Sequence, residues 1–399
     1  MKILHVNFWY NSGSVGKIVR DIHIASLQEG AESFVLYGRG PKVQGKNIIK
    51  VSSEWEAKVH ALLARLFGVD FGYSFFSTGK AIRLIKKISP DVVHLHCLNG
   101  HFINAYRLIE YLKKSGIRTV LTLHAELMHT AGCEHAFECE KWKTECSHCQ
   151  KMRGCISGLF RDDAAYCYRR MKKAMQKFDN LVVVSVSQWL LERAKQSPIL
   201  EDKNHCVVYN GLDASIFKIR TGAGVKQELG IGEDEKIVFH VTPFFNEDPT
   251  HVKGGYYVLK LAEQMKDQKV RFVVAGEYAP EIHVPSNVIL LGKVSNQEKL
   301  AELYSVADFT LLTSRRETFS MVTTESLCCG TPVIGFRAGG PEQIALKEFS
   351  TFVEHGNLSE LENCILSQKQ YEREKCSETA RRVYSAETMV KEYREVYLQ

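Results

Sequence analysis

Two glutamates, Glu317 and Glu325, are separated by seven residues in a stretch whose residue types could bind a phosphorylated sugar. An apolar run at 308–313 predicts a strand that leads into a polar turn. A short helix should follow and end at Gly330, because glycine is a good helix terminator. Eight positions of about 100° each rotate roughly 80° beyond two full turns, so one continuous helix would not place both carboxylates on one face. We therefore expect Glu317 in the turn and Glu325 on the helix.

The start of this helix should supply further binding groups. The backbone N–H groups of Phe319, Ser320, Met321 and Val322 would lie between the two carboxylates. The first N–H groups of a helix have no intrahelical partners, and they attract phosphate. Carboxylates can accept hydrogen bonds from sugar hydroxyls, so the segment combines groups for both parts of a sugar phosphate.

The elements that position these residues alternate between strand and helix along the whole chain. Near-continuous apolar runs between amphipathic segments are typical of parallel sheets covered on both faces. The sequence thus predicts an α/β protein with two doubly wound domains, whose ligands bind beyond the carboxyl ends of the strands, in the cleft between the domains. The expected strands are 2–8, 33–37, 91–96, 118–124, 181–185, 206–209, 236–242, 270–276, 287–291, 308–313 and 332–336.

The bulk composition is that of an ordinary globular protein of two domains, with 399 residues, 45% of them hydrophobic and 25% charged. The net charge of +6 does not indicate nucleic acid binding. No apolar run approaches the ~20 residues of a membrane span. The N-terminus is typical of a first strand and not of a signal peptide, so we expect a cytoplasmic protein. Twelve cysteines in such a chain suggest thiols or metal ligands more than disulfides.

The stretch around Glu317 and Glu325 resembles the Glu-x7-Glu signature of the retaining glycosyltransferases of family 4, which have the GT-B fold of two Rossmann-like domains facing each other across a cleft. Further matches occur in the order of the family over almost the whole chain. They are His124 at a strand end, Asn210-Gly211-Leu212-Asp213, Lys253-Gly254, Pro332-Val333-Ile334 and Gly339-Gly340-Pro341-Glu342.

This resemblance implies roles for single residues. Glu325 would bind the ribose of a nucleotide-sugar donor, and Glu317 the hydroxyls of the transferred sugar. The N–H groups of residues 319–322 would hold the sugar and the distal phosphate. Lys253 would neutralise the departing diphosphate, and His124 would contact the donor sugar. Family members often have glycine at the positions of Thr318 and Ser320.

Catalysis is accordingly assigned to His124, Lys253 and Glu317, with front-face attack and the leaving phosphate accepting the proton of the acceptor. No metal is required for this scheme, because the protein itself supplies positive charge. UDP- and GDP-sugars fit equally well, with base contacts expected near Lys293 and Val294. Asn210 and Asp213 should point into the interdomain cleft.

Gly13 and Gly16 follow the first strand and open a helix. Glycines at such a place let the backbone approach a ligand closely, and the family uses this loop near the diphosphate. The loop is not a Walker A motif, because Ile18 stands where Ser or Thr should follow Lys17. The alternative is a tight strand–helix turn without a ligand.

A cysteine cluster follows the strand that ends at His124. Cys146 and Cys149 have the spacing of a metal knuckle, and together with Cys133 and Cys139 they could hold a tetrahedral structural zinc. Cys155, His135 and His148 are additional candidate ligands. Free thiols or a disulfide are the alternatives. A similar insert occurs in a subset of the family that builds bacterial exopolysaccharide.

The segment 55–87 combines aromatic and basic residues, which suits the surface of an anionic membrane. The alternative is core-packing helices with a solvated basic face. The expected domains are residues 1–213 on the acceptor side, with the insert at 133–155, residues 214–384 for the donor, and a terminal helix at 385–399 that crosses back to the first domain.

The sequence thus predicts a retaining transferase that moves a hexose from a UDP- or GDP-sugar to a glycan or lipid-linked oligosaccharide. Its setting would be exopolysaccharide, capsule or lipopolysaccharide synthesis at the inner face of the plasma membrane. A non-catalytic sugar-nucleotide-binding scaffold and a GT-B epimerase are the alternatives.

Overall fold

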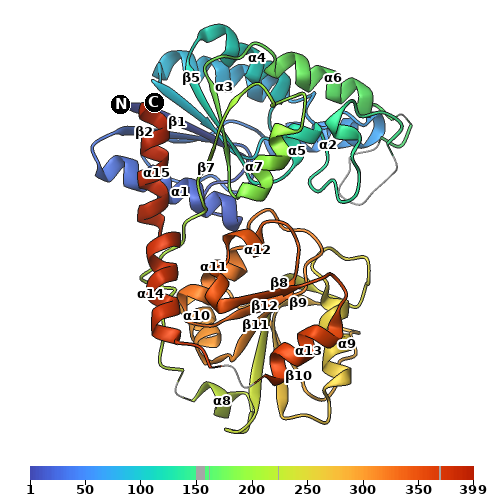
Figure 1. Cartoon of the computed structure of the whole chain (residues 1–399). Helices are drawn as coiled ribbons and strands as arrows, with labels where there is room; N and C mark the ends of the chain where they lie inside the picture. Colours follow the sequence, from blue (N-terminus) through green and yellow to red (C-terminus); the bar gives the residue numbers. More distant parts are fainter. Residues whose placement is uncertain (150–157, 161, 223, 368–369) are drawn as a thin grey trace. The chain divides into compact units, whose positions relative to one another are not determined.

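The computed structural model describes residues 1–149, 158–160, 162–222, 224–367 and 370–399. The chain divides into two units (Figure 1). Unit 1 comprises Met1–Tyr209 together with Met389–Gln399, and unit 2 comprises Asn210–Thr388. Both units are Rossmann-like, each with one parallel sheet and helices between the strands, so the α/β class expected from the apolar runs is confirmed.

Unit 1 contains a sheet of seven strands in the order β3-β2-β1-β4-β5-β6-β7, with every neighbouring pair parallel. The strands are β1 Lys2–Asn7, β2 Glu32–Tyr37, β3 Ile48–Lys50, β4 Val92–Leu95, β5 Arg118–Leu123, β6 Leu181–Ser185 and β7 Asn204–Val207. The helices are α1 Gly13–Gln28, α2 Glu54–Phe67, α3 Phe75–Ile88, α4 Ala105–Ser115, α5 Leu127–Thr130, α6 Ala164–Met175 and α7 Gln188–Lys195, with a 3-10 turn at Lys141–Lys143.

Unit 2 contains a parallel sheet of six strands in the order β10-β9-β8-β11-β12-β13. The strands are β8 Lys236–Phe245, β9 Val270–Tyr278, β10 Val288–Gly292, β11 Phe309–Leu312, β12 Val333–Phe336 and β13 Ser350–Val353. The helices are α8 Val225–Glu228, α9 Gly255–Gln264, α10 Gln297–Val306, α11 Met321–Cys328, α12 Pro341–Ile344, α13 Leu358–Leu366 and α14 Arg373–Tyr384, with a 3-10 turn at Lys347–Phe349.

Each sheet reverses its strand order at one place, between β1 and β4 in unit 1 and between β8 and β11 in unit 2. At such a switch point the loops that follow the two strands diverge to opposite sides, which leaves a crevice at the carboxyl edge where ligands of doubly wound sheets bind. The loops after β1, β4, β8 and β11 are therefore the places to look for a site.

The last helix, α15 Ala386–Leu398, belongs mainly to unit 1. Its apolar residues Met389, Val390, Tyr393, Val396 and Tyr397 are buried in one cluster with residues of β1, α1, β4, β5 and β6. The Arg118 guanidinium of β5 donates a 2.8 Å hydrogen bond to the carbonyl of Val396, which fixes the C-terminal end of the helix. Among the residues that the structure describes, no helix is both long and apolar enough to span a bilayer.

Candidate functional site

A lysine and a glutamate meet at the switch point of unit 2. Lys253 lies in the loop after β8, and its ammonium donates a 2.6 Å hydrogen bond to Glu317 Oε1 in the turn after β11. The hydroxyl of Ser314 donates to the same carboxylate oxygen at 2.9 Å. The two side chains are 30% and 15% exposed, so solvent and ligands can reach the pair. Two residues that the sequence assigned to the same chemistry are thus in direct contact, although 64 positions separate them.

Glycines allow the loops of this site to approach one another closely. Gly254 has a φ of +70°, and a Cβ there would lie 2.1 Å from the carbonyl oxygen of Thr313. A Cβ on Gly340 would lie 2.3 Å from the carbonyl oxygen of Thr318. Both positions therefore require glycine. The N–H of Gly340 donates to the carbonyl of Glu317 at 2.9 Å, so the loop after β12 directly braces the turn that carries this carboxylate.

Helix α11 begins at Met321, directly after Ser320, and it carries Glu325. As the sequence predicted, Glu317 lies in the turn and Glu325 on the helix. Ser320 caps the helix by accepting a 3.3 Å hydrogen bond from the N–H of Thr323. Its φ of +81° is a conformation that favours glycine, which accounts for the glycine often found there in the resembling family. The first N–H groups of α11 have no intrahelical acceptors, and they lie in the chain between Glu317 and Glu325.

Glu325 is oriented by a tyrosine that the sequence analysis missed. The buried Tyr304 of α10 donates its hydroxyl to Glu325 Oε2 at 3.0 Å. Burial, followed by the charge of Glu325, raises the pKa of Tyr304 well above its ordinary value, so the phenol keeps its proton and remains a donor. The contact between Tyr304 and Glu325 arises from the packing of α10 against α11, which no local pattern in the sequence indicates. The role of Ser314, three residues before Glu317 in the same turn, was also missed.

In unit 1, the loop after β1 has a close backbone approach of its own. Gly13 begins α1 with a φ of +65°, and a Cβ on Gly16 would lie 3.3 Å from the backbone nitrogen of Asn11. The N–H of Asn11 donates to the carbonyl of Gly16 at 2.9 Å, which closes the loop onto the first turn of the helix. This geometry agrees equally with a ligand-binding loop and with a tight turn.

His124 follows β5 and belongs to a series of histidines on neighbouring strands. His96 Nδ1 lies 3.3 Å from His124 Nε2, and His96 Nε2 lies 3.5 Å from His5 Nδ1. Burial lowers the pKa of His124 to about 3. Burial and the neighbouring His23 lower that of His5 to about 3 as well. These imidazoles are therefore neutral near neutral pH, and His124 could act as a hydrogen-bonding group but not as a cation.

The donor atoms of His5, His94 and His96 all lie within 4.8 Å of one another, a spacing that could also suit a metal ion. His94, however, uses both ring nitrogens in hydrogen bonds, at 2.7 Å to the Tyr397 hydroxyl and at 2.8 Å to Thr122 Oγ1. A metal would have to displace one of these bonds in a fully buried place. The arrangement is better explained as a hydrogen-bonded series between the sheet and α15.

The remaining candidate residues lie apart from these contacts. Val294 follows β10, beyond the carboxyl end of that strand. Asn210 is buried and is the first residue of unit 2. Asp213 Oδ1 accepts hydrogen bonds from the N–H and the hydroxyl of Ser215, so this carboxylate stabilises a local turn. Cys133, Cys139, Cys146 and Cys149 all line one cavity of unit 1. Cys155 lies outside the described residues.

Comparison with known families agrees with this architecture. Residues 225–383 match the family model of glycosyl transferases group 1, and residues 3–216 match that of glycosyltransferase family 4. The second match covers more than half of the chain. The chain therefore belongs to glycosyltransferase family 4 and is a glycosyltransferase of the GT-B type.

Curated relatives span most of the chain. An N-acetyl-alpha-D-glucosaminyl L-malate synthase of Bacillus anthracis is 25% identical over 343 residues, which cover 82% of this chain and 79% of the relative. A putative colanic acid biosynthesis glycosyl transferase, WcaC of Escherichia coli K12, is 22% identical and covers 100% of this chain and 99% of its own length.

Solved structures share the fold at low sequence identity. A sucrose-phosphate synthase of Thermosynechococcus elongatus superposes with a TM-score of 0.69 at 14% identity, covering 100% of this chain and 99% of the other. Anabaena HepE in complex with UDP-glucose has a TM-score of 0.65 at 15% identity, with 99% of both chains covered. WaaG, a glycosyltransferase involved in lipopolysaccharide biosynthesis, has the same TM-score, identity and coverage.

Proposed function

We propose that this protein transfers a hexose from a nucleotide-sugar donor to a glycan or lipid-linked oligosaccharide, with retention of the anomeric configuration. The contact between Lys253 and Glu317 carries the proposal, because it joins a cation for the diphosphate to a carboxylate for the sugar at the switch point of unit 2. HepE, which has the same fold, was solved with UDP and with UDP-glucose, and this favours a UDP-sugar.

In the proposed reaction, the distal phosphate of the donor lies at the N-terminus of α11. Lys253 compensates the negative charge that develops as the diphosphate leaves, an interaction that is stronger in the transition state than in the ground state. The ammonium and the helix N–H groups both supply positive charge, so the scheme assigns no catalytic role to a metal ion.

The two carboxylates have separate tasks in this scheme. Glu317 accepts hydrogen bonds from the hydroxyls of the sugar while it still holds the ammonium of Lys253. Glu325, oriented by Tyr304, accepts those of the ribose. The acceptor hydroxyl attacks from the face that the diphosphate leaves, and the phosphate takes its proton. His124 remains a proposed contact to the donor sugar through its neutral imidazole.

An acceptor carried by a membrane lipid is supported by a surface of unit 1. On α2, Trp55 and Leu62 are 71% and 56% exposed, and they alternate along one stripe with exposed Lys58 and Arg65. The buried residues of α2 lie on the opposite stripe. Exposed apolar side chains flanked by lysine and arginine suit the interface of an anionic bilayer.

Helix α3 repeats this pattern. Phe76 is 82% exposed, and exposed Lys80, Arg83 and Lys87 follow it on the same stripe. The two helices are neighbours, because the N–H of Phe76 donates to the carboxylate of Glu56 on α2 at 2.9 Å. We propose that this surface, made of the exposed stripes of α2 and α3, contacts the inner face of the plasma membrane. WcaC and WaaG, named for colanic acid and lipopolysaccharide biosynthesis, favour an acceptor of the same kind.

The first experiment is a thermal-shift panel of UDP-, GDP-, ADP- and TDP-sugars with their free nucleotides. A ligand that binds only the folded state raises the melting temperature by mass action. We expect a shift with one nucleotide class, and its loss in Glu325→Ala. Incubation of that donor with candidate acceptors, followed by NMR of the product, then reads the anomeric configuration. An inverted product would refute retention.

The same donor and acceptor incubations distinguish this proposal from two alternatives, a non-catalytic scaffold and an epimerase. A non-catalytic scaffold would bind the donor without turnover under any acceptor condition. An epimerase would convert the donor when no separate acceptor is present.

Membrane contact is tested separately by co-sedimentation with vesicles of phosphatidylglycerol and phosphatidylcholine. Trp55→Ser combined with Phe76→Ser should reduce binding to the anionic vesicles, whereas Leu366→Ser, at a 41% exposed position of unit 2, should not. Equal binding by all these variants would remove the support for a lipid-linked acceptor while leaving the donor site unaffected.

A further inference from the structure

We propose that Cys133, Cys139, Cys146 and Cys149 bind one structural zinc ion that fixes residues 131–149, the described part of the segment after α5. This inference does not depend on the proposed function, since none of the four cysteines belongs to the donor site of unit 2. The four side chains line the same cavity of about 440 Å³, together with Trp142 and Thr130. Four cysteines in one place match the ligand set of a tetrahedral structural zinc, and Cys146-x2-Cys149 has the spacing of a metal knuckle.

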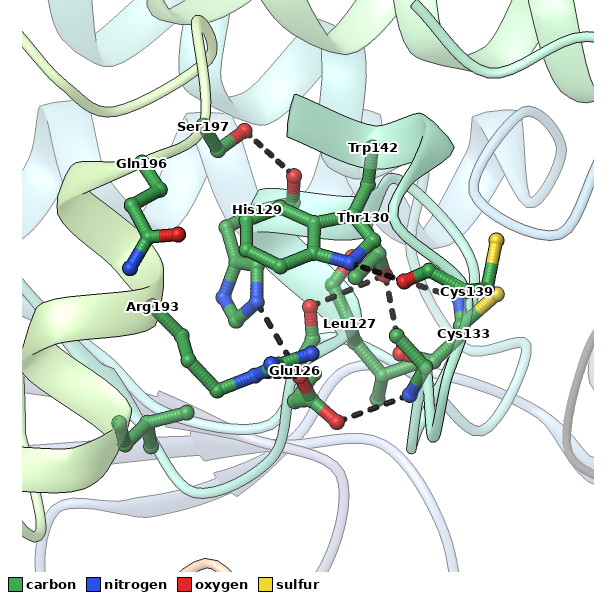
Figure 2. A network of polar contacts seen from close by, with 12 residues as sticks. Glu126, Leu127, His129, Thr130, Cys133, Cys139, Trp142, Arg193, Gln196 and Ser197 are labelled. Atoms are coloured by element: carbon green, nitrogen blue, oxygen red, sulfur yellow. Dashed lines mark hydrogen bonds and ion pairs between the residues drawn. The ribbon is translucent and has the colours of Figure 1, made fainter. Parts of the chain in front are cut away.

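A buried polar network holds the backbone that carries the first two cysteines (Figure 2). The N–H of Cys133 donates to Thr130 Oγ1 at 2.9 Å. The indole N–H of Trp142 donates to the carbonyl of Cys139 at 2.7 Å, and the Tyr168 hydroxyl donates to the carbonyl of Trp142 at 2.8 Å. The backbone of both cysteines is thus fixed by side chains that lie inside unit 1.

The centre of this network is a fully buried carboxylate. Glu126 accepts a 2.6 Å hydrogen bond from the guanidinium of Arg193 on α7 and a 2.8 Å hydrogen bond from the N–H of Ala136. His129 Nε2 lies 3.5 Å from Glu126 Oε1. Burial alone would raise the pKa of Glu126, but the contacts with His129, Arg193 and Ala136 lower it to about 2. The guanidinium also lies 4.7 Å from the ring centroid of Trp142 (Figure 2). The first half of the segment is therefore held by buried contacts that do not involve a metal.

The second pair of cysteines lies in a loop that has the turn and the charge for a metal knuckle. His148 has a φ of +46°, so the chain turns sharply between Cys146 and Cys149. The ammonium of Lys141 donates to the carbonyls of Ser147 and His148 at 3.0 and 2.8 Å. Four thiolates around Zn²⁺ leave a net charge of about −2, and this ammonium would offset part of it.

The second pair lies outside the helices, and Cys146 contacts the network of the first pair through a 3.7 Å hydrogen bond from its thiol to the carbonyl of Thr130. Only the 3-10 turn Lys141–Lys143 lies between Cys139 and Cys146. Among the described residues, the only group of three metal-ligating atoms within 4.8 Å of one another is formed by His5, His94 and His96. The sulfurs of the four cysteines are therefore farther apart in this structure than they would be around a bound ion. Zn–S bonds of about 2.3 Å would draw them to about 3.8 Å from one another. Zinc would thus connect this loop to the first half of the segment, which buried contacts already hold.

A fifth cysteine lines the same cavity but is unsuited to the metal. The thiol of Cys167 on α6 is buried and donates to the carbonyl of Gly68 at 3.4 Å. Burial raises the pKa of Cys167 to about 11, which disfavours the thiolate that zinc requires. The site therefore consists of the four cysteines in the segment itself.

The test is elemental analysis of the full chain, purified without chelator from zinc-supplemented medium. We expect about one zinc per chain in the wild type and in the control Cys206→Ser, a half-buried cysteine of β7. Cys146→Ser combined with Cys149→Ser should lose the metal. As a measurement that does not depend on the stability of that variant, the wild type is also treated with a chelator and then with Co²⁺, which should produce the visible absorption of tetrahedral thiolate coordination.

Limited proteolysis supplies a readout that is independent of activity. Removal of zinc should expose new cleavage sites between residues 131 and 149, and restored zinc should protect them. A wild type without zinc, with all thiols titratable in denaturant, would overturn the proposal. A wild type whose thiol count falls short by two or four after denaturation would instead indicate disulfides. Zinc retained in full by the double variant would place the metal elsewhere.

Discussion

Substitutions of Lys253 and of Glu317, which are in direct contact, should have opposite effects on nucleotide binding. An ammonium about 4 Å from a phosphate charge contributes roughly 4 kcal/mol at an effective dielectric constant of 20. Glu317 already neutralises part of the ammonium at 2.6 Å, so we take about 3 kcal/mol as the part realised as the diphosphate leaves. Since 1.36 kcal/mol is tenfold in rate, Lys253→Met should slow transfer by about 150-fold.

Glu317→Gln removes the competing carboxylate and leaves the ammonium available to the phosphates. This variant should therefore bind free UDP, or the nucleotide found in the panel, at least as tightly as the wild type, although it transfers sugar more slowly. Lys253→Met should bind the nucleotide more weakly. The partly exposed pair contributes only about 0.2–1 kcal/mol to folding, so neither variant should unfold.

The assay combines calorimetric titration of the nucleotide with the rate of nucleotide release during transfer. Transfer by Lys253→Met within about threefold of the wild type would refute the electrostatic role of this lysine. Nucleotide affinity that falls equally in both variants would show that the pair acts only as a structural contact. The control is Arg271→Met. This change removes the 2.7 Å ion pair between Arg271 and Glu235, which lies at the N-terminal end of β9 and thus away from the carboxyl edge of the sheet.

Three further predictions concern neighbouring features. Tyr304→Phe removes the hydrogen bond to the Glu325 carboxylate, which is worth about 1.5–3 kcal/mol, and should weaken nucleotide binding by about tenfold or more in calorimetry. The melting temperature of the free protein should change little, and an unchanged affinity would show that Tyr304 does not position Glu325. Ser320→Gly relieves the strain of the positive φ but loses the helix cap, so its free energy of unfolding in urea should stay within about 1 kcal/mol of the wild type. Ser320→Ala keeps the strain and also loses the cap, so it should be the less stable of the two variants. His5 and His124 have pKa values of about 3 in the folded protein and about 6.5 in the unfolded chain, so the unfolded state binds protons first as the pH falls. The free energy of unfolding should therefore decrease from about pH 6.5 toward pH 3, by up to 1.36 kcal/mol per pH unit and group. In denaturant titrations His5→Asn should show a shallower decrease, and a slope equal to that of the wild type would contradict the desolvation of this histidine.

The central strands could be predicted from the sequence, because strands buried on both faces form near-continuous apolar runs rich in Val, Ile and Leu. Two short edge strands were missed, Ile48–Lys50 and Ser350–Val353. Both lie at an end of their sheet, and most of their residues are only partly buried, so they need no continuous apolar run. The terminal helix at 385–399 was visible from its apolar spacing, and the structure places it at Ala386–Leu398.

The candidate site was visible only in part. The turn and helix carrying Glu317 and Glu325 follow from local rules for helix starts and breaks. The contact with Lys253 was not predictable from local rules, since it depends on the order of strands β8 and β11 in the sheet. Tyr304 gave no signal, because a tyrosine at that position of α10 is as suitable for packing alone as for holding a carboxylate.

The position of α15 has a consequence for how the chain is made. Unit 2 is one continuous stretch, whereas the hydrophobic core of unit 1 includes Met389, Tyr393 and Tyr397 from the last segment. During synthesis on the ribosome, the second half of the chain can fold before the first half has received all of its core residues. The earliest residues to emerge are therefore among the last to reach their final packing, and a nascent chain arrested before residue 389 should hold one folded unit and one unit whose hydrophobic core is incomplete.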